Sequence, residues 1–187
     1  MSSFDPATLT RQRFHEPSDP PAPPAQARVL QLLLAQDGST TRLCETIAAG
    51  PVALHLLAQR VTASVPPAVQ AVLPGQRFIE RITCLAAHGQ VMMDNLSYIA
   101  LEGLQADVRR DLEAGTMPIG HLLARLWVRR RFLEPVPALF ERLWSAAGGL
   151  PDAGASRLYC IATPEGPRML IAETFRRGML MAPAAQA

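Results

Sequence analysis

Two hairpins dominate the pattern of apolar and polar positions along the chain. Each consists of two segments in which apolar residues either alternate with polar ones or form a continuous run. The two segments meet at a glycine-containing turn, which is typical of paired antiparallel strands. The predicted hairpins span 77–87 and 90–100 around His88-Gly89, and 156–163 and 168–175 around Pro164-Glu165-Gly166. Residues 127–134 predict a further strand. Residues 52–61 are strand-like, although their leucines also allow a helix.

Helical periodicity and helix-boundary residues mark the segments between these strands. Asp37-Gly38 stops one helix, Ser39 can cap the next, and Pro118 stands near the first turn of another. The predicted helices span 27–36, 40–48, 101–113, 116–126 and 138–147. Strands joined by hairpins, with helices inserted between them, predict an α+β domain built on a single antiparallel β-sheet flanked by helices.

The proline distribution divides the chain. Five prolines lie between Pro17 and Pro24, a density that excludes helix and central strand. We therefore expect a poorly ordered proline-rich arm over 1–26, one domain over 27–180 and a C-terminal tail over 181–187.

Composition excludes several function classes. The 187 residues suit one domain, and the net charge of +2 is spread along the chain, without the clustered basic face that nucleic acid requires. The three cysteines show no metal-ligand spacing, and no P-loop, GxGxxG or GxSxG motif is present, so we expect no metal and no cofactor. With neither a signal peptide nor an apolar run long enough for a membrane span, a cytoplasmic location is expected.

Two charged residues stand on otherwise apolar strand faces. Glu173 shares a predicted strand face with Met169, Ile171 and Phe175. If that face is in the interior, the pKa of Glu173 should rise unless a cation compensates. The alternatives are a solvated face or a simple pairing with an arginine. Arg81 lies in a similar setting and can grip a carboxylate, or it can form a structural salt bridge. Together the two would bracket a ligand with a carboxylate at one end and a hydroxyl at the other.

Four short segments, in the same order as in the family, resemble the chorismate pyruvate-lyases. They are Asp37-Gly-Ser-Thr-Thr-Arg-Leu43, Arg77-Phe-Ile-Glu-Arg-Ile82, Gly115-Thr-Met-Pro-Ile-Gly120 and Arg168-Met-Leu-Ile-Ala-Glu-Thr-Phe175. The resemblance covers roughly residues 28–180. It implies a cofactor-free carbon–oxygen lyase that converts chorismate to 4-hydroxybenzoate and pyruvate.

The resemblance also implies roles for individual residues. Arg81 would bind the ring carboxylate, and Glu173 would meet the hydroxyl end and serve as the catalytic acid. Ser39 and Ile119 would bind the substrate through backbone groups of two flaps, with Thr116 and Gly120 shaping the second flap.

One family residue is missing. Members carry a second arginine fifteen residues after the first, where this chain has Leu96 flanked by Asn95 and Ser97. Arg129 to Arg131 are possible substitutes. This departure keeps open a related enzyme acting on another chorismate-like substrate. A non-catalytic aromatic-acid-binding module, like the effector-sensing domains of bacterial regulators, is the other alternative.

Overall fold

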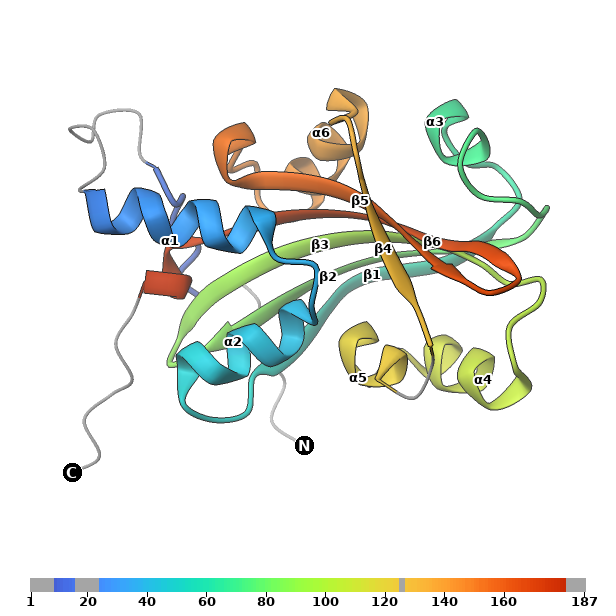
Figure 1. The fold of residues 1–187 in the computed structure, drawn as a ribbon, viewed down its shortest axis with the longest axis horizontal. Helices are drawn as coiled ribbons and strands as arrows, with labels where there is room; N and C mark the ends of the chain where they lie inside the picture. Colours follow the sequence, from blue (N-terminus) through green and yellow to red (C-terminus); the bar gives the residue numbers. More distant parts are fainter. Residues whose placement is uncertain (1–8, 16–23, 125–126, 181–187) are drawn as a thin grey trace.

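The computed structural model describes residues 9–15, 24–124 and 127–180. In this part of the chain one antiparallel sheet has six strands in the order β1-β2-β3-β6-β5-β4, with helices on both sides (Figure 1). The strands are β1 (Ala53–Thr62), β2 (Phe78–Ala87), β3 (Gln90–Ala100), β4 (Arg129–Leu133), β5 (Ser156–Thr163) and β6 (Gly166–Phe175). The predicted fold class, an α+β domain on a single antiparallel sheet, is confirmed.

The helices divide between the two faces of the sheet. One face packs against α3 (Pro67–Gln70) and α6 (Pro137–Ala146), and the other faces α2 (Thr40–Ala48), α4 (Ala106–Ala114) and α5 (Ile119–Leu123) (Figure 1). The apolar side chains of α1 (Pro24–Ala35) join those of α2 and the end of β6 in a third cluster. Two short 3₁₀ turns, η2 (Ala153–Ala155) and η3 (Arg177–Leu180), flank the second hairpin.

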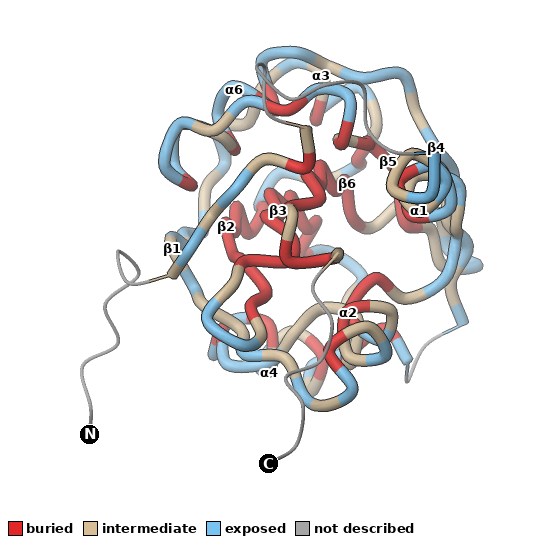
Figure 2. The backbone as a smooth tube through the Cα atoms, turned by 90° about the vertical axis from the view of Figure 1, so that its left-hand side faces the viewer, coloured by how far each residue is buried: buried red, intermediate tan, exposed pale blue. Residues whose placement is uncertain are grey.

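Both predicted hairpins are confirmed, and the ambiguous segment 52–61 is a strand. β1 is an edge strand paired on one side only with β2, so many of its side chains stay exposed (Figure 2). Some helix boundaries differ from the prediction. The helix predicted over 101–113 begins at Ala106, and the helix predicted over 116–126 spans Ile119–Leu123. The short helix α3 lies in a segment for which no helix was predicted.

Most of the predicted arm, 1–8 and 16–23, and the predicted tail over 181–187 lie outside the described residues, whereas residues 9–15 pack against the domain. Thr10 exchanges backbone hydrogen bonds with Gly89 and Val91 at 3.1 and 2.8 Å, and Phe14 is 3% exposed within the cluster around α1. Arg11 Nε donates to Asp94 Oδ1 at 3.0 Å. The domain also begins earlier than residue 27, because Pro24 starts α1, where a missing backbone N–H costs nothing.

Strand register sets polar side chains beside one another on the face toward α2 and α5. Arg81 on β2 lies opposite Ser97 on β3, and Thr83 lies opposite Asn95. Asn95 in turn lies opposite Glu173 on β6. Since neighbouring strands are about 4.8 Å apart, Arg81 and Glu173 project from strands about 10 Å apart, with β3 between them.

Candidate functional site

A small cavity lies between this sheet face and the N-terminal ends of α2 and α5. Its volume is about 40 Å³, enough for about three water molecules. All six strands and the two helix ends contribute to its wall. The lining residues are Thr40, Thr41, Leu54, Arg81, Thr83, Leu85, Met93, Asn95, Pro118, Ile119, Gly120, Leu123, Arg130, Tyr159, Ile171 and Glu173.

Arg81 is a buried cation that contacts no carboxylate of the described residues. Its side chain is fully buried, and Nη2 donates to the carbonyl oxygens of Gly115 and Met117, each at 3.0 Å. Nε and Nη1 are buried without a hydrogen-bond partner. Burial lowers the pKa of Arg81 to about 10, so the guanidinium remains charged at neutral pH. The structural salt bridge considered for Arg81 is not formed in the described part of the chain.

The two carbonyl groups that hold Arg81 belong to the connection between α4 and α5. Gly115 ends α4 in a left-handed conformation with φ of 71°, which glycine adopts without strain. Gln59 on β1 fixes the same helix end, since its Nε2 donates to the carbonyl groups of Leu112 and Glu113 at 3.2 and 2.9 Å. The free side of the guanidinium is thereby directed away from these carbonyls.

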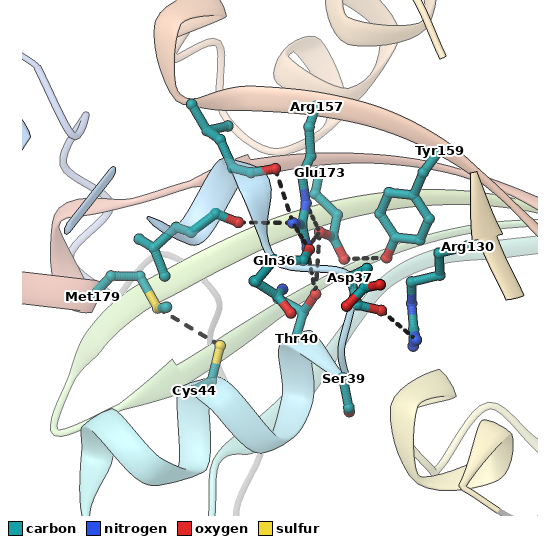
Figure 3. Close-up of polar contacts among 12 residues, drawn as sticks. Gln36, Asp37, Ser39, Thr40, Cys44, Arg130, Arg157, Tyr159, Glu173 and Met179 are labelled. Carbon is teal, nitrogen blue, oxygen red and sulfur yellow. Dashed lines mark hydrogen bonds and ion pairs between the residues drawn. The ribbon is translucent and has the colours of Figure 1, made fainter. Parts of the chain in front are cut away.

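Glu173 is buried as well, but it is fully engaged (Figure 3). Oε2 accepts from Nε and Nη2 of Arg157 at 3.0 and 2.9 Å and from Thr40 Oγ1 at 3.3 Å. Oε1 accepts from the Tyr159 hydroxyl at 2.6 Å. The compensating cation that the sequence left open is therefore Arg157, and a carboxylate surrounded by donors is suited to accept a hydrogen bond rather than to donate a proton.

Arg157 is itself held by the C-terminal end of α1. Its Nη1 donates to the carbonyl oxygens of Leu33 and Gln36, each at 2.7 Å. Helix C-terminal carbonyls lack partners within the helix and carry partial negative charge, so a buried arginine is favoured there. The ion pair thus joins α1, β5 and β6 at one end of the cavity.

A second cavity-lining cation, Arg130, comes from β4. Its Nη1 donates to the carbonyl oxygen of Asp37 at 2.9 Å, and its buried Nε has no partner (Figure 3). Arg129 and Arg131, its neighbours in the basic run, are exposed. Because Glu173 is neutralised by Arg157, the lining side chains carry an excess of two positive charges, from Arg81 and Arg130.

Two flaps close over the cavity. Thr40 and Thr41 at the start of α2 face Ile119 and Gly120 at the start of α5 across it. A Cβ at Gly120 would lie 2.8 Å from Ser39 Oγ and closer still to Thr41 Oγ1, so only glycine permits this approach. Further out, His121 Nε2 contacts Glu45 Oε1 at 2.9 Å and links the two helices.

The predicted site residues are partly brought together. Arg81, Glu173 and Ile119 line the cavity, whereas Ser39 caps α2 and lines an adjoining outer pocket with Arg42 and Arg130. Thr116 is not among the lining residues, and Gly120 is. Tyr159 and Arg157 were not predicted. They share a strand face with Ile161 on β5, so the signal that singled out Arg81, a polar residue on a partly apolar strand face, was present for them too.

Leu96 is not a cavity position. It is buried in the cluster on the α3 and α6 side of the sheet, while its neighbours Asn95 and Ser97 face the cavity side. The two strands change register between Leu85 and Ala86, so counting fifteen residues from Arg81 does not return to the same face. The side chains opposite Arg81 and Thr83 are the short Ser97 and Asn95, which leave space above β3 between Arg81 and Glu173.

No protein-family model matches the sequence, and no curated protein sequence matches it. Several solved structures are similar to part of this chain in backbone structure. The C-terminal domain of the histidine utilization repressor from Pseudomonas syringae has a TM-score of 0.45 and 8% identity, covering 73% of this chain and 99% of that one. The gene product SA0254 from Staphylococcus aureus has a TM-score of 0.43 and 15% identity, covering 67% and 83%.

A third such structure is the ligand-binding domain of a protein assigned to the GntR family of transcriptional regulators in Bordetella bronchiseptica. Its TM-score is 0.41 at 14% identity, covering 68% of this chain and 84% of that one. None of these three is named as a chorismate lyase. Sequence identity and TM-score are too low for a ligand or an activity of these proteins to be inferred for this chain.

Three further observations concern the described residues only. They contain no group of three or more histidine, cysteine, aspartate or glutamate side chains able to hold a metal ion. None of their helices is both long and apolar enough to cross a membrane. The three cysteines are buried and unpaired, and Cys44 Sγ contacts Met179 Sδ at 3.7 Å.

Proposed function

We propose that this protein binds chorismate in the cavity and converts it to 4-hydroxybenzoate and pyruvate. The observation that carries the proposal is Arg81, a fully buried guanidinium that lines the cavity and has two nitrogen atoms without a hydrogen-bond partner. A buried charge without a counterion is costly, and a ligand carboxylate would supply the missing partner with matching fork geometry.

The charge of the lining favours a ligand with two carboxylates. Arg81 and Arg130 are both cationic, and the remaining charged lining residue, Glu173, is already paired. Chorismate carries one carboxylate on its ring and one on its enolpyruvyl group. In the proposed complex Arg81 holds the first and Arg130 the second, replacing the family arginine that this chain lacks.

The proposed reaction is an elimination that needs no oxidant or added water. The ether bond between C3 and the enolpyruvyl oxygen breaks, C4 loses its hydrogen, and the ring becomes aromatic. That hydrogen ends in the methyl group of pyruvate, so the atoms balance. The expectation that Glu173 donates a proton does not fit its contacts, because three donors surround it. We propose instead that it accepts from the C4 hydroxyl while the hydrogen moves within the substrate.

Access requires the flaps to separate. Ligand pockets typically measure about 300–1,000 Å³, far more than the volume between the closed flaps. The outer pocket shares Gly120, Leu123 and Arg130 with the cavity and lies on the same side. We propose it as the entrance, with the contact between Gly120 and Thr41 as the closure. Such closure would make product release slow relative to chemistry.

The second candidate function is binding without conversion. The full satisfaction of Glu173 favours it, since the cavity then offers no free acid. A related enzyme acting on another chorismate-like substrate is supported by the short Asn95 and Ser97 where the family arginine would be expected. All three functions use Arg81 for a carboxylate, and they differ in the fate of the bound ligand.

The deciding experiment is to incubate the purified full chain with chorismate, after dialysis against a strong chelator, and to quantify products by mass spectrometry. We expect equal amounts of 4-hydroxybenzoate and pyruvate. Calorimetry with 4-hydroxybenzoate is run on the same sample. Binding without conversion would establish the binding module, conversion only after adding a divalent metal would refute the cofactor-free reaction, and neither binding nor conversion would refute the proposal.

Replacing Arg130 tests the second carboxylate contact. Arg130→Met should raise KM for chorismate about 10- to 100-fold, the usual range for losing a hydrogen-bonded charge partner. Affinity for 4-hydroxybenzoate, which lacks the second carboxylate, should change little. Arg129→Met is the matched control because Arg129 precedes Arg130 on the same strand but is exposed. Equal losses in the two variants would show a general charge effect and remove Arg130 from the site.

A further inference from the structure

Tyr159 already supplies Glu173 with the kind of hydrogen bond that a ligand hydroxyl could also donate. It lines the cavity beside Glu173, and its hydroxyl donates to Oε1, the oxygen of Glu173 that Arg157 leaves free (Figure 3). Burial, followed by the Glu173 carboxylate, raises the pKa of Tyr159 well above its usual value of 10. The hydroxyl therefore keeps its proton and stays a donor.

The packing around the ring fixes this arrangement. Tyr159 lies opposite Ile171 on β6, and the Arg157 guanidinium carbon lies 5.3 Å from its ring centre. Phe132 on β4 contacts the ring edge-on, with centroids 6.2 Å apart. With the ring held on both sides, the hydroxyl has little freedom to leave Glu173.

The contact changes what a ligand must bring. A buried carboxylate oxygen without a partner costs free energy, and a ligand hydroxyl would normally remove that cost. Here Tyr159 removes it before any ligand arrives. An aromatic acid without a hydroxyl therefore leaves no oxygen of Glu173 unsatisfied when it displaces water from the cavity.

We propose that Tyr159 is the specificity-determining residue at this end of the cavity, and that by satisfying Glu173 it lets the site bind aromatic carboxylates with or without a para-hydroxyl. This inference rests on the proposed binding of an aromatic carboxylate by Arg81. Selectivity then lies at the carboxylate end, where Nε and Nη1 of Arg81 have no hydrogen-bond partner, and is relaxed at the Glu173 end.

The test compares benzoate with 4-hydroxybenzoate by calorimetry on the full chain. In the parent protein we expect the two affinities to agree within about threefold. In Tyr159→Phe, Oε1 loses its donor, so only 4-hydroxybenzoate can satisfy it. The ratio should then shift by about 10-fold or more toward the hydroxylated ligand, the usual effect of a hydrogen bond to a charged group. Tyr98→Phe is the matched control, because Tyr98 is the other tyrosine and is buried in the cluster on the opposite face of the sheet.

Each outcome separates this inference from the proposed function. If both ligands bind but the ratio is the same in the parent and Tyr159→Phe, the role of Tyr159 is refuted while Arg81 stands. A parent that prefers 4-hydroxybenzoate by more than about 30-fold refutes it as well, and this measurement needs no variant if Tyr159→Phe does not fold. Failure of both ligands to bind the parent refutes the carboxylate site and this inference with it.

Discussion

Arg81→Met is expected to weaken binding of 4-hydroxybenzoate strongly while leaving the free energy of unfolding unchanged or higher. Binding should weaken by about 2–5 kcal/mol, because the ligand carboxylate loses its buried counterion. Stability should not fall in parallel. Methionine removes a buried charge that has no carboxylate partner, and this gain offsets the loss of about 1 kcal/mol for each hydrogen bond to Gly115 and Met117.

Arg157→Met is the matched control for that result. Both arginines are buried on the same side of the sheet, but Arg157 has a carboxylate partner at 2.9 Å and Arg81 has none among the described residues. Urea unfolding should show a loss of about 3–5 kcal/mol for Arg157→Met and none for Arg81→Met. A large loss of stability in Arg81→Met, with ligand affinity unchanged, would make Arg81 a structural residue.

Local pattern was sufficient to predict much of the sheet. The strands of both hairpins follow from apolar segments and glycine turns that lie within about twenty residues of one another, and their pairing is local. Arg81 and Glu173 were singled out because a charge on an apolar strand face must be satisfied by something. In the structure both are buried and line one cavity.

Long-range pairing was beyond the reach of this pattern. β6 pairs with β3, about eighty residues earlier, and this alone places Glu173 opposite Asn95 and two strands from Arg81. Nothing in the alternation fixes that order of strands. The alternation pattern also could not show that Leu96 faces the other side of the sheet. The register change after Leu85 shifts the pairing of β2 with β3 by one residue.

The arm shows a different limit. Proline density predicts the absence of regular structure, but residues 9–15 need none to be ordered. Phe14 is buried. Asp94 accepts hydrogen bonds from Nε of Arg11 and from Nε of Arg176, the second at 2.6 Å. Tertiary contacts of this kind depend on the β2–β3 hairpin being present, and segment composition carries no information about them.

Glu173→Gln is expected to lower the free energy of unfolding by about 3 kcal/mol or more. The amide keeps the size of the side chain but removes the charge, so Arg157 is left as a buried cation without a counterion. The carbonyl groups at the end of α1 still accept from Arg157 and hold the loss near the lower end of the usual range of about 3–5 kcal/mol.

Glu80→Gln is the matched control on the other face of the sheet. Glu80 is 5% exposed and pairs with two arginines, but Arg60 and Arg142 are 59% and 41% exposed and can turn into water when the charge is removed. Its loss should be clearly smaller than that of Glu173→Gln. The difference isolates burial of the cation as the cause.

The sign of a second substitution makes the test decisive. In the parent protein Arg157→Met should destabilise, because it leaves Glu173 unpaired. In the Glu173→Gln background the same change removes the unpaired cation and should stabilise. Urea unfolding of the two single variants and the double variant measures both effects. If Arg157→Met destabilises equally in both backgrounds, the ion pair contributes no coupling, and Arg157 acts only through its hydrogen bonds to the end of α1.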